Sequence, residues 1–318
     1  MNPFINSAGK LDLTMEIPGD RLISRAALLV AALAQGETEI EGLSNHAQIV
    51  GLISGLNAAG AKIEEKDGKT IVSGGTKSIL EFLPPEKERD GGERLLAGLF
   101  AETETVIESG LSEPDHVQIM LRHFGIKLEK TGRGLKLEPR SVIKARKVMI
   151  PGDISHAAYF MAAGLIIKDS RVLILNAGIN FTRTGIITAF RDMGGHAAVL
   201  NKRVMCGESV AEVETRTSSL FGTEISAALA KRAVGGLAPL AVCACFADGV
   251  TKIDYSQTAE CVPPALIKGL LEMGAKIKET ENEIIIEGAA LKAVEIDAEG
   301  DEAAALGLAL AAAGCQGL

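Results

Sequence analysis

The sequence contains no tryptophan and only two tyrosines among its 318 residues, and aromatic residues make up 3% of it. Proteins that bind single-stranded nucleic acid usually stack bases on aromatic side chains. Basic residues are also in the minority, with 33 Lys and Arg against 41 Asp and Glu, which gives a net charge of −8. These shortages argue against a nucleic-acid partner and against an anionic membrane surface. To bind a small anionic ligand, the chain would need a local cluster of basic residues despite its negative net charge.

Further absences concern the compartment and the chemistry. The five cysteines form no CxxC pair and no spacing typical of a zinc site. This cysteine usage suits a reducing cytosol, and no secretory signal pattern opens the sequence. The longest apolar run, residues 303–314, is shorter than the roughly 18–20 residues that cross a bilayer. We therefore expect a soluble cytoplasmic protein that uses no metal, cofactor or membrane.

One pattern recurs along the chain, whose length allows about two domains. An apolar helix is followed by a short strand, an amphipathic helix that ends in glycine, and a β-hairpin. Copies begin near Gly19, Gly91, Gly152 and Gly235, and an incomplete fifth copy begins near Gly300. The first copy closes with KDGK, a sequence typical of a tight hairpin turn. Repetition on this scale predicts a domain built from similar units.

The first helix of each copy is apolar on nearly all sides, as in AALLVAALA and APLAVCACF. Such a helix must be buried all round, whereas most α/β folds place a sheet in the centre. The pattern predicts an α/β (α+β) fold of βαβαββ-type units with parallel helices inside and sheets outside. Because KVMIPGD restarts the pattern of TMEIPGD, we expect crossovers near Gly19 and Gly152. Residues 21–150 would form the first domain, with two copies, and residues 1–20 plus 151–318 the second, with two full copies and a truncated third.

Glycine, often together with aspartate, stands at the starts of these apolar helices. Aspartate caps the free N–H groups of a helix start, and capping alone would explain a single aspartate at such a position. If the helices run parallel, their positive ends also gather on one face, where they favour an anion. Five starts of one type therefore predict an anion site in addition to capping.

Two long segments, PGDRLISRAALLVAALAQGETEI and PGDISHAAYFMAAGLI, resemble signatures of the enolpyruvyl transferases, and of the EPSP synthase (3-phosphoshikimate 1-carboxyvinyltransferase) family in particular. NFTRTGIITAFRDMGG and GLLEMGAKIKETENEIIIEG follow in the family's order. The resemblance implies a two-domain inside-out α/β barrel with a cleft between the domains. It also implies a transferase that moves the carboxyvinyl group of phosphoenolpyruvate to a phosphorylated acceptor, in the shikimate pathway of aromatic amino acid biosynthesis.

The residues that carry out this chemistry in the family are replaced here. The family's acid pair falls on Gly235 and Gly236, and glycine cannot move a proton. A motif rich in cations falls around Thr258, where this chain has none, and the motif of the last helix falls on a stretch that includes Ala303. We therefore assign no catalytic residue.

The family would also hold a further unit just after Gly92, so the first domain has two copies where the family has three.

Some residues that can contact an anion remain near the helix starts. The candidates for ligand binding are Arg21, Ser24, Arg25, Ser112, Ser155 and Arg183. The resemblance implies that the family's phosphate-binding arginine of the first buried helix falls on Ala26 in this chain. Arg25, one residue earlier, should point roughly 100° away from that position on a helix. His116 and His123 are seven residues apart, but no third ligand has the right spacing for a metal. We expect the Asp115-His116 pair at the surface rather than in acid–base work.

Three interpretations stay open at this point. In the first, the chain is a pseudoenzyme that has lost ordinary carboxyvinyl transfer and binds an anionic ligand or a partner through its interdomain cleft. In the second, it is an active enolpyruvyl transferase with an altered phosphorylated acceptor. In the third, it is a non-catalytic structural partner or oligomer that uses its incomplete first domain as an interface.

Overall fold

The computed structural model describes residues 9–75, 83, 87, 89–107, 115–139, 142–233, 235–292 and 294–315. The chain divides into two compact units. Unit 1 comprises Met1–Ile17, Ile154–Lys202 and Ala211–Leu318, and unit 2 comprises Pro18–Asp153 and Arg203–Val210. The short segment Arg203–Val210 therefore belongs with a unit whose other residues all precede it by at least 50 positions.

Unit 2 contains two copies of the repeated pattern. The elements of the first copy are α1 (Arg21–Leu33), β2 (Glu37–Glu41), α2 (Ala47–Ala58), β3 (Lys62–Lys66) and β4 (Lys69–Ser73). Those of the second are α3 (Gly91–Gly98), β5 (Thr105–Ile107), α4 (His116–His123), β6 (Leu128–Thr131) and β7 (Gly134–Leu137), followed by β8 (Val148–Met149). The strands form two sheets, in the orders β3-β4-β2-β8 and β5-β7-β6.

Unit 1 begins with β1 (Asp12–Glu16), which pairs in parallel with β9 of the third copy. That copy contains α5 (Ile154–Ile166), β9 (Arg171–Gly178), the short 3₁₀ helix η3 (Phe181–Arg183), α6 (Gly185–Asp192), β10 (His196–Met205) and β11 (Glu208–Arg216). Next come β12 (Glu224–Ile225), α7 (Ala227–Arg232), α8 (Leu237–Cys245), β13 (Val250–Asp254), α9 (Pro264–Glu272), β14 (Lys276–Glu279), β15 (Glu283–Glu287) and α10 (Glu302–Gly314). The sheet orders are β1-β9-β11-β10 and β12-β13-β15-β14.

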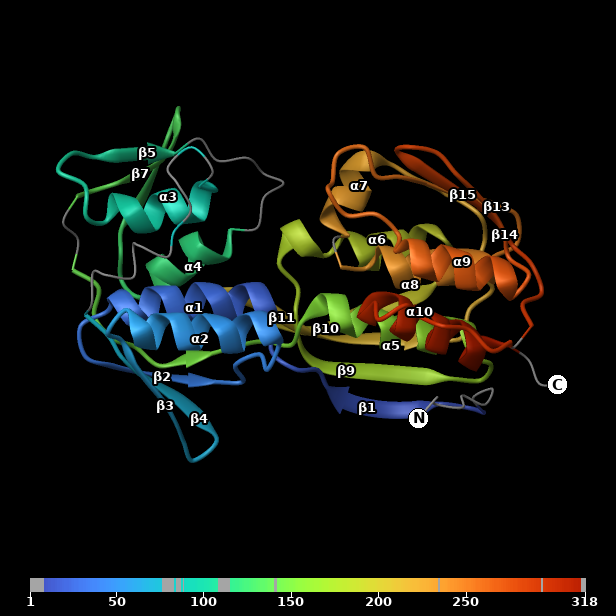
Figure 1. Ribbon diagram of the computed structural model, residues 1–318, viewed down its shortest axis with the longest axis horizontal. Coiled ribbons are helices and arrows are strands. Elements are labelled where there is room, and N and C mark those ends of the chain that lie inside the picture. Colours follow the sequence, from blue (N-terminus) through green and yellow to red (C-terminus); the bar gives the residue numbers. More distant parts are fainter. Residues whose placement is uncertain are drawn as a thin grey trace. The chain divides into compact units, whose positions relative to one another are not determined.

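The apolar helices occupy the interior of each unit. Every residue of α8 is buried, and α1 is buried from Ile23 to Leu33 apart from Arg25. In unit 1, α5, α8 and α10 contact one another and supply much of one hydrophobic core, with sheets on the outside (Figure 1). Long apolar helices take this place because an apolar surface on all sides has to be removed from water. The predicted fold class, with helices inside and sheets outside, is confirmed.

The predicted hairpin turn of the first copy is confirmed as well. Asp67 and Gly68 join β3 to β4, and both have positive φ, 53° and 73°. Two adjacent residues with positive φ make the type I′ turn, whose twist matches that of a hairpin. Within the described residues, no helix is both long enough and apolar enough to cross a membrane.

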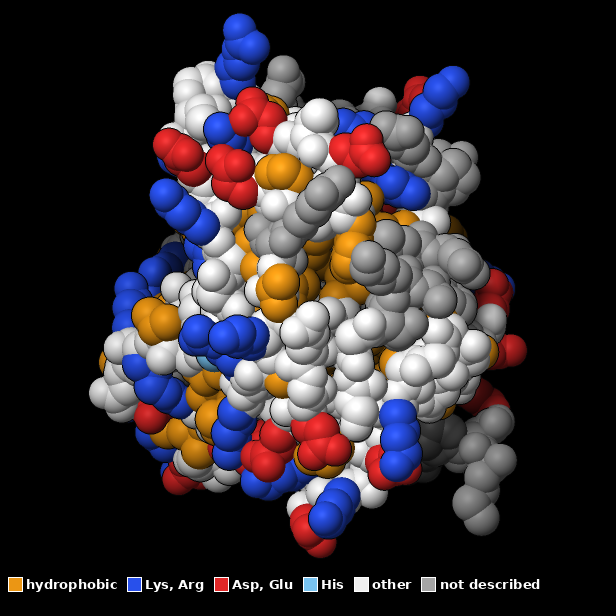
Figure 2. Space-filling model, turned by 90° about the vertical axis from the view of Figure 1, so that its left-hand side faces the viewer, with side chains coloured by type: hydrophobic (Ala, Val, Ile, Leu, Met, Phe, Trp, Pro, Cys, Tyr) orange, Lys and Arg blue, Asp and Glu red, His pale blue; other side chains and the backbone are white. Residues whose placement is uncertain are grey.

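The surface of unit 2 is not uniformly polar. Figure 2 shows hydrophobic side chains in a hollow, with Lys, Arg, Asp and Glu side chains around it. In this unit Val50 and Val142 are more than half exposed, at 55% and 58%. Single exposed valines are common on proteins, so these two carry no functional meaning by themselves.

Candidate functional site

The two Pro-Gly-Asp motifs meet at the start of α1. Gly19 and Gly152 form an antiparallel bridge. The N–H of Asp20 donates to the carbonyl of Pro151 at 2.8 Å, and the N–H of Asp153 donates to the carbonyl of Pro18 at 3.0 Å. The aspartates of both motifs therefore lie at the same helix end, although they are far apart in the sequence.

These aspartates bind the free N–H groups of the first turn of α1. The Asp20 carboxylate accepts from the N–H groups of Leu22, at 2.8 Å, and Ile23, at 3.0 Å. The Asp153 carboxylate accepts from the N–H of Arg21 at 3.4 Å. Asp90 and Asp301 cap α3 and α10 in the same manner. Because the chain's own carboxylates take these N–H groups, an anion near α1 must be held by side chains.

A cavity of about 330 Å³ lies beside the start of α1. It is lined by Arg21, Leu22, Arg25, Gln48, Ile49 and Leu52. The Arg21 guanidinium donates to the Gln48 side-chain oxygen at 2.9 Å. Arg25 shares this cavity, although a helical offset of one residue turns it away from the direction of Ala26, which is buried. Two guanidinium groups beside apolar side chains suit a small ligand that carries a phosphate or a carboxylate.

A carboxylate within the chain already pairs with one of these arginines. Arg25 contacts the Glu93 carboxylate at 2.6 Å, and the Glu93 side chain is 7% exposed. Glu93 and Asp90 also form a capping box at the start of α3, with the N–H of Asp90 donating to Glu93 at 3.1 Å. Glu93 is not among the residues predicted from the sequence, although an Asp three residues before a Glu is the pattern of a capping box.

The serines among the predicted ligand contacts differ in their surroundings. Ser24 is fully buried, and its hydroxyl accepts from the N–H of Ser44 at 3.0 Å, so it holds the loop that precedes α2. Ser112 lies outside the described residues. Ser155 lies in the first turn of α5, and its hydroxyl accepts from Arg183 at 2.6 Å. Arg183 is 5% exposed and ends the short helix η3. The structure thus brings Arg183 and Ser155 together in unit 1, and Arg21 and Arg25 together in unit 2.

Gly235, which precedes α8, lies directly against Ser155. A Cβ atom at Gly235 would be 2.2 Å from the Ser155 hydroxyl oxygen, and its φ of +80° disfavours any other residue. Its N–H donates to both oxygens of the Glu260 carboxylate, at 2.8 and 2.6 Å. The position at which the family resemblance placed an acid is therefore closed by Ser155 and already bonded to a carboxylate. Glu260 could not be predicted from the sequence, because no local pattern links it to a glycine 25 residues earlier.

The other positions matched to family motifs have structural contacts. The Thr258 hydroxyl accepts from the N–H of Glu260 at 3.1 Å, and the Ala303 carbonyl accepts from the Tyr159 hydroxyl at 3.3 Å. Burial raises the pKa of Tyr159, and the negative charges of Glu260, Asp301 and Glu302 raise it further. This part of unit 1 therefore combines the Arg183 guanidinium with several carboxylates of the chain. Their negative charges disfavour the binding of an anionic ligand there.

The expectation that His116 lies at the surface is wrong. His116 is 3% exposed, and its Nδ1 lies 2.8 Å from the Glu208 carboxylate, whose side chain is 1% exposed. A buried imidazole is tolerated because Glu208, 92 residues later, supplies a partner for it. Within the described residues, no three His, Cys, Asp or Glu side chains are grouped so that they could hold a metal ion.

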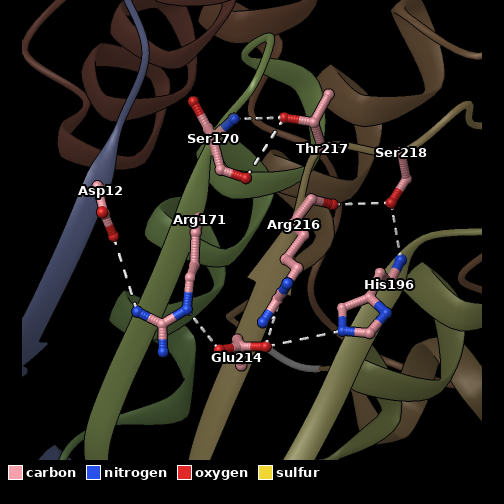
Figure 3. Close-up of polar contacts among 8 residues, drawn as sticks. All are labelled: Asp12, Ser170, Arg171, His196, Glu214, Arg216, Thr217 and Ser218. Atoms are coloured by element: carbon pink, nitrogen blue, oxygen red, sulfur yellow. Dashed lines mark hydrogen bonds and ion pairs between the residues drawn. The ribbon is translucent and has the colours of Figure 1, made fainter.

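Several basic residues outside these clusters pair with one carboxylate on the sheet of β9, β11 and β10. Glu214 contacts Arg171 at 2.6 Å and Arg216 at 2.8 Å, and His196 lies 3.8 Å away (Figure 3). The hydrogen bond from Arg216, and then that from Arg171, hold the pKa of Glu214 below its usual value despite burial. These basic groups pair with a carboxylate of the chain, so Arg21 and Arg25, which line a cavity, are the better candidates for a site.

Comparison with known proteins gives one consistent result. A family model described as EPSP synthase (3-phosphoshikimate 1-carboxyvinyltransferase) matches residues 5–92 and 93–317, two segments that meet within α3. A 3-phosphoshikimate 1-carboxyvinyltransferase from Thermoanaerobacter sp. (strain X514) is 35% identical over 266 residues. That match covers 81% of this chain but only 63% of the relative's own length.

A second relative with the same name, from Syntrophotalea carbinolica, is 28% identical over 396 residues, covering 98% of this chain and 92% of the relative. That alignment is longer than the 318 residues of this chain, so the relative contains internal residues that this chain lacks.

Among solved structures, EPSP synthase from Acinetobacter baumannii has a TM-score of 0.87 at 22% identity. The match covers 98% of this chain and 92% of that structure's chain. The enolpyruvyl transferase NikO from Streptomyces tendae has a TM-score of 0.76 at 17% identity, with 98% and 91% covered. The fold is therefore shared even where few residues are identical.

Proposed function

We propose that this chain, which belongs to the EPSP synthase family, no longer transfers a carboxyvinyl group and binds a small anionic ligand in the cavity at the start of α1. One observation carries the proposal. Arg21 and Arg25 line a cavity of about 330 Å³, whereas the N–H of Gly235, before α8, is bonded to the chain's own Glu260. Two arginines thus line a cavity at one helix start, while at the other the position matched to the family's acid is a glycine bonded to a carboxylate of the chain.

The loss of transfer follows from what stands at the positions matched to the family. The reaction in the relatives' name needs groups that donate and accept protons. The matched residues are Gly235, Gly236, Thr258 and Ala303, and none has a side chain that ionises near neutral pH. An acid cannot be restored at Gly235 without moving Ser155, because the space for a Cβ is already filled.

The ligand class follows from the groups around the cavity. A guanidinium presents a planar set of donors that fits phosphate and carboxylate oxygens. Glu93 already competes for Arg25, whereas Arg21 is held by the neutral Gln48. Arg21 should therefore make the principal contact. A cavity of about 330 Å³ is at the small end of ligand pockets, so one phosphorylated or carboxylated small molecule is the expected occupant.

Titration calorimetry of the full chain with 3-phosphoshikimate, and separately with inorganic phosphate, tests the binding. Saturable binding is expected, and Arg21→Gln should weaken it about tenfold or more, because a charge-assisted hydrogen bond is lost. Arg133→Gln is the matched control, since Arg133 is an exposed arginine of the same unit outside the cavity. The absence of saturable binding, or equal affinity in the Arg21 and Arg133 variants, would contradict the proposal.

A separate assay tests the loss of transfer. The chain is incubated with phosphoenolpyruvate and 3-phosphoshikimate, and inorganic phosphate is measured over time. No release above that of the protein-free mixture is expected. Release that depends on the protein and disappears in Arg21→Gln would overturn this part of the proposal and support an active transferase. Because binding is measured without phosphoenolpyruvate, the two parts can fail separately.

A further inference from the structure

Basic and acidic residues are unevenly distributed along this chain. Residues 122–149 contain nine Lys or Arg and two Glu, whereas residues 272–302 contain ten Asp or Glu and three Lys. The first range lies in unit 2 and the second in unit 1. The two ranges therefore carry net charges of +7 and −7, although the whole chain carries −8. Surfaces of opposite charge attract each other when two molecules meet, provided that the charged side chains are gathered and exposed.

The basic side chains of unit 2 gather around the end of α4. Arg122 lies in the last turn of this helix. A Cβ atom placed at Gly125, just after the helix, would lie 3.2 Å from a guanidinium nitrogen of Arg146, so the segment before β8 passes beside the helix end. Two further cations, each two residues away from this contact, and an exposed valine complete what we call the basic face: Arg122, Lys127, Val142, Lys144 and Arg146.

The four cations of the basic face are exposed and are not used by the chain itself. Their neighbours are paired, Lys136 with Glu104 and Lys147 with Glu41, both at 2.7 Å. Within the part of the chain that the structure describes, no carboxylate forms an ion pair with the four cations. The negative end of α4 explains one cation in its last turn, Arg122, but not the other three. These cations are therefore available to carboxylates from outside the chain.

The carboxylates of unit 1 gather beside α9. The N–H of Lys292 donates to the carbonyl of Met273 at 2.8 Å, so the segment that follows β15 runs back along this helix. Residues 294–302 of that segment contain five Asp or Glu and no Lys or Arg. Glu299 pairs with Lys268 of α9 at 2.6 Å. We call Leu271, Glu272 and residues 294–302 the acidic face, where six carboxylates outnumber Lys268 and Lys292.

The two faces match in more than the sign of their charge. Each has exposed aliphatic side chains among its charges, with Val142 in the basic face and Leu271 and Val294, both 47% exposed, in the acidic face. Pairs between carboxylates and cations would fix the register of a contact, and the aliphatic side chains would leave water. Because single exposed ion pairs contribute little, such a contact needs several of them and should be reversible and sensitive to salt.

We propose that the basic face of one copy binds the acidic face of a second copy, so that this protein associates with itself head to tail. The net charge of −8 opposes association at long range, but salt screens charges that are more than about 10 Å apart at 0.1 M, whereas pairs in direct contact are screened less. Each copy keeps a second face for a further neighbour, because the two faces of a head-to-tail contact differ. No residue of either face lines the cavity at α1, so the inference stands independently of the proposed function.

Sedimentation equilibrium of the full chain tests the association. At about 50 mM NaCl, the average mass should rise above the 33.3 kDa of one copy as the protein concentration increases to about 200 μM. At about 500 mM NaCl the dissociation constant should be at least about fivefold higher, because ion pairs at the surface are screened. The mass of one copy at every concentration in low salt, or association that strengthens with salt, would overturn the proposal.

One variant of each face separates a head-to-tail contact from other kinds of association. Arg122→Glu with Arg146→Glu disables the basic face, and Glu272→Lys with Glu302→Lys disables the acidic face. Each variant alone should remain monomeric. A mixture of the two should form a complex of two copies and no larger species, because the first variant keeps a working acidic face and the second a working basic face. Far-UV circular dichroism verifies that both variants are folded.

The matched control is Lys66→Glu with Arg133→Glu. This variant makes the same change in net charge in the same unit, at two exposed residues outside the basic face. Its dissociation constant should stay within about twofold of that of the parent chain. Equal losses in the control and the basic-face variant, or a mixture that stays monomeric, would refute the head-to-tail contact. A monomeric chain whose basic face binds poly-L-glutamate would also refute it, in favour of a foreign acidic partner.

Discussion

The starts of α1 and α8 are two versions of one local structure with opposite surroundings. Each opens an apolar, buried helix after a turn that contains glycine. At α1, the guanidinium groups of Arg21 and Arg25 border a cavity. At α8, Gly235 touches Ser155 and its N–H is bonded to Glu260. A helix start supplies only N–H groups and a positive end, so the side chains that other segments bring to it decide whether it can take a ligand.

The carboxylates that bond to these two helix starts come from different distances along the sequence. Asp20 caps α1 from the adjacent position and is not among the residues that line the cavity. The carboxylate at Gly235 comes from a residue 25 positions later. In unit 1 the chain's own residues therefore occupy the space at the start of α8, whereas in unit 2 two arginines line a cavity at the start of α1. Four changes would break or sharpen this contrast.

The largest effect is expected from Gly235→Ala, which puts a methyl group where the Ser155 hydroxyl lies. The steric conflict and the positive φ should together lower the free energy of unfolding by about 4 kcal/mol. Gly68→Ala is the matched control, because its φ is +73° but no atom lies within 4 Å of the added Cβ. It should cost about 1 kcal/mol. Urea unfolding measures both, and equal losses would mean that the α8 start is not closed by Ser155.

Glu260→Gln should have the next largest effect. It removes the charged acceptor of the Gly235 N–H and should lower the free energy of unfolding by about 1–3 kcal/mol. Glu224→Gln is the control, because the Glu224 side chain is 82% exposed and its pair with Lys252 spans 3.5 Å. That change should stay within about 0.5 kcal/mol. If urea unfolding gives the two variants the same stability, Glu260 does not hold the start of α8.

At α1 the corresponding change acts on binding. Glu93→Gln removes the carboxylate that competes for Arg25, while an amide can still accept in the capping box. Affinity for 3-phosphoshikimate should rise roughly fivefold, which corresponds to about 1 kcal/mol. Calorimetric titration gives the dissociation constants, and Glu104→Gln, an exposed glutamate of the same unit paired with Lys136, should leave them unchanged. Weaker binding in Glu93→Gln would show that the Arg25 pair does not compete with the ligand.

The smallest effect concerns the ion pairs of Glu41 at the end of β2, in the same unit as α1. Hydrogen bonds from Lys147, and then from Lys69, lower the pKa of Glu41 to about 2 from an ordinary 4.5. A carboxyl with a depressed pKa contributes stability above its unfolded pKa, and this is lost as the pH falls through the folded pKa. The melting temperatures of Glu41→Gln and the parent chain should therefore differ slightly at pH 7. In calorimetric scans that difference should close between about pH 4.5 and pH 2; a gap that stays constant at acid pH would exclude the ion pairs as its cause.

The sequence predicts the framework of both starts but not their polar contacts. The apolar helices, the two Pro-Gly-Asp turns and the Asp67-Gly68 hairpin are encoded within short windows, and spacing alone reveals them. Arg25 and Glu93 are 68 positions apart, and His116 and Glu208 are 92 apart. No periodicity connects such pairs. For the same reason His116 was expected at the surface, because its partner becomes visible only once the hairpin tip is placed against α4.

What the sequence determined by itself was which helices must be removed from water, where the chain turns, and which residue types stand at the positions matched by resemblance to the family's motifs. These features depend on the solvation and the backbone preferences of neighbouring residues, which are local properties. Only the tertiary structure decided that Arg25 faces the same cavity as Arg21, that Glu260 bonds to the N–H of Gly235, and that His116 meets Glu208. Ionic and hydrogen-bonding interactions act over a few ångströms, so they are fixed only when packing has set which distant segments touch.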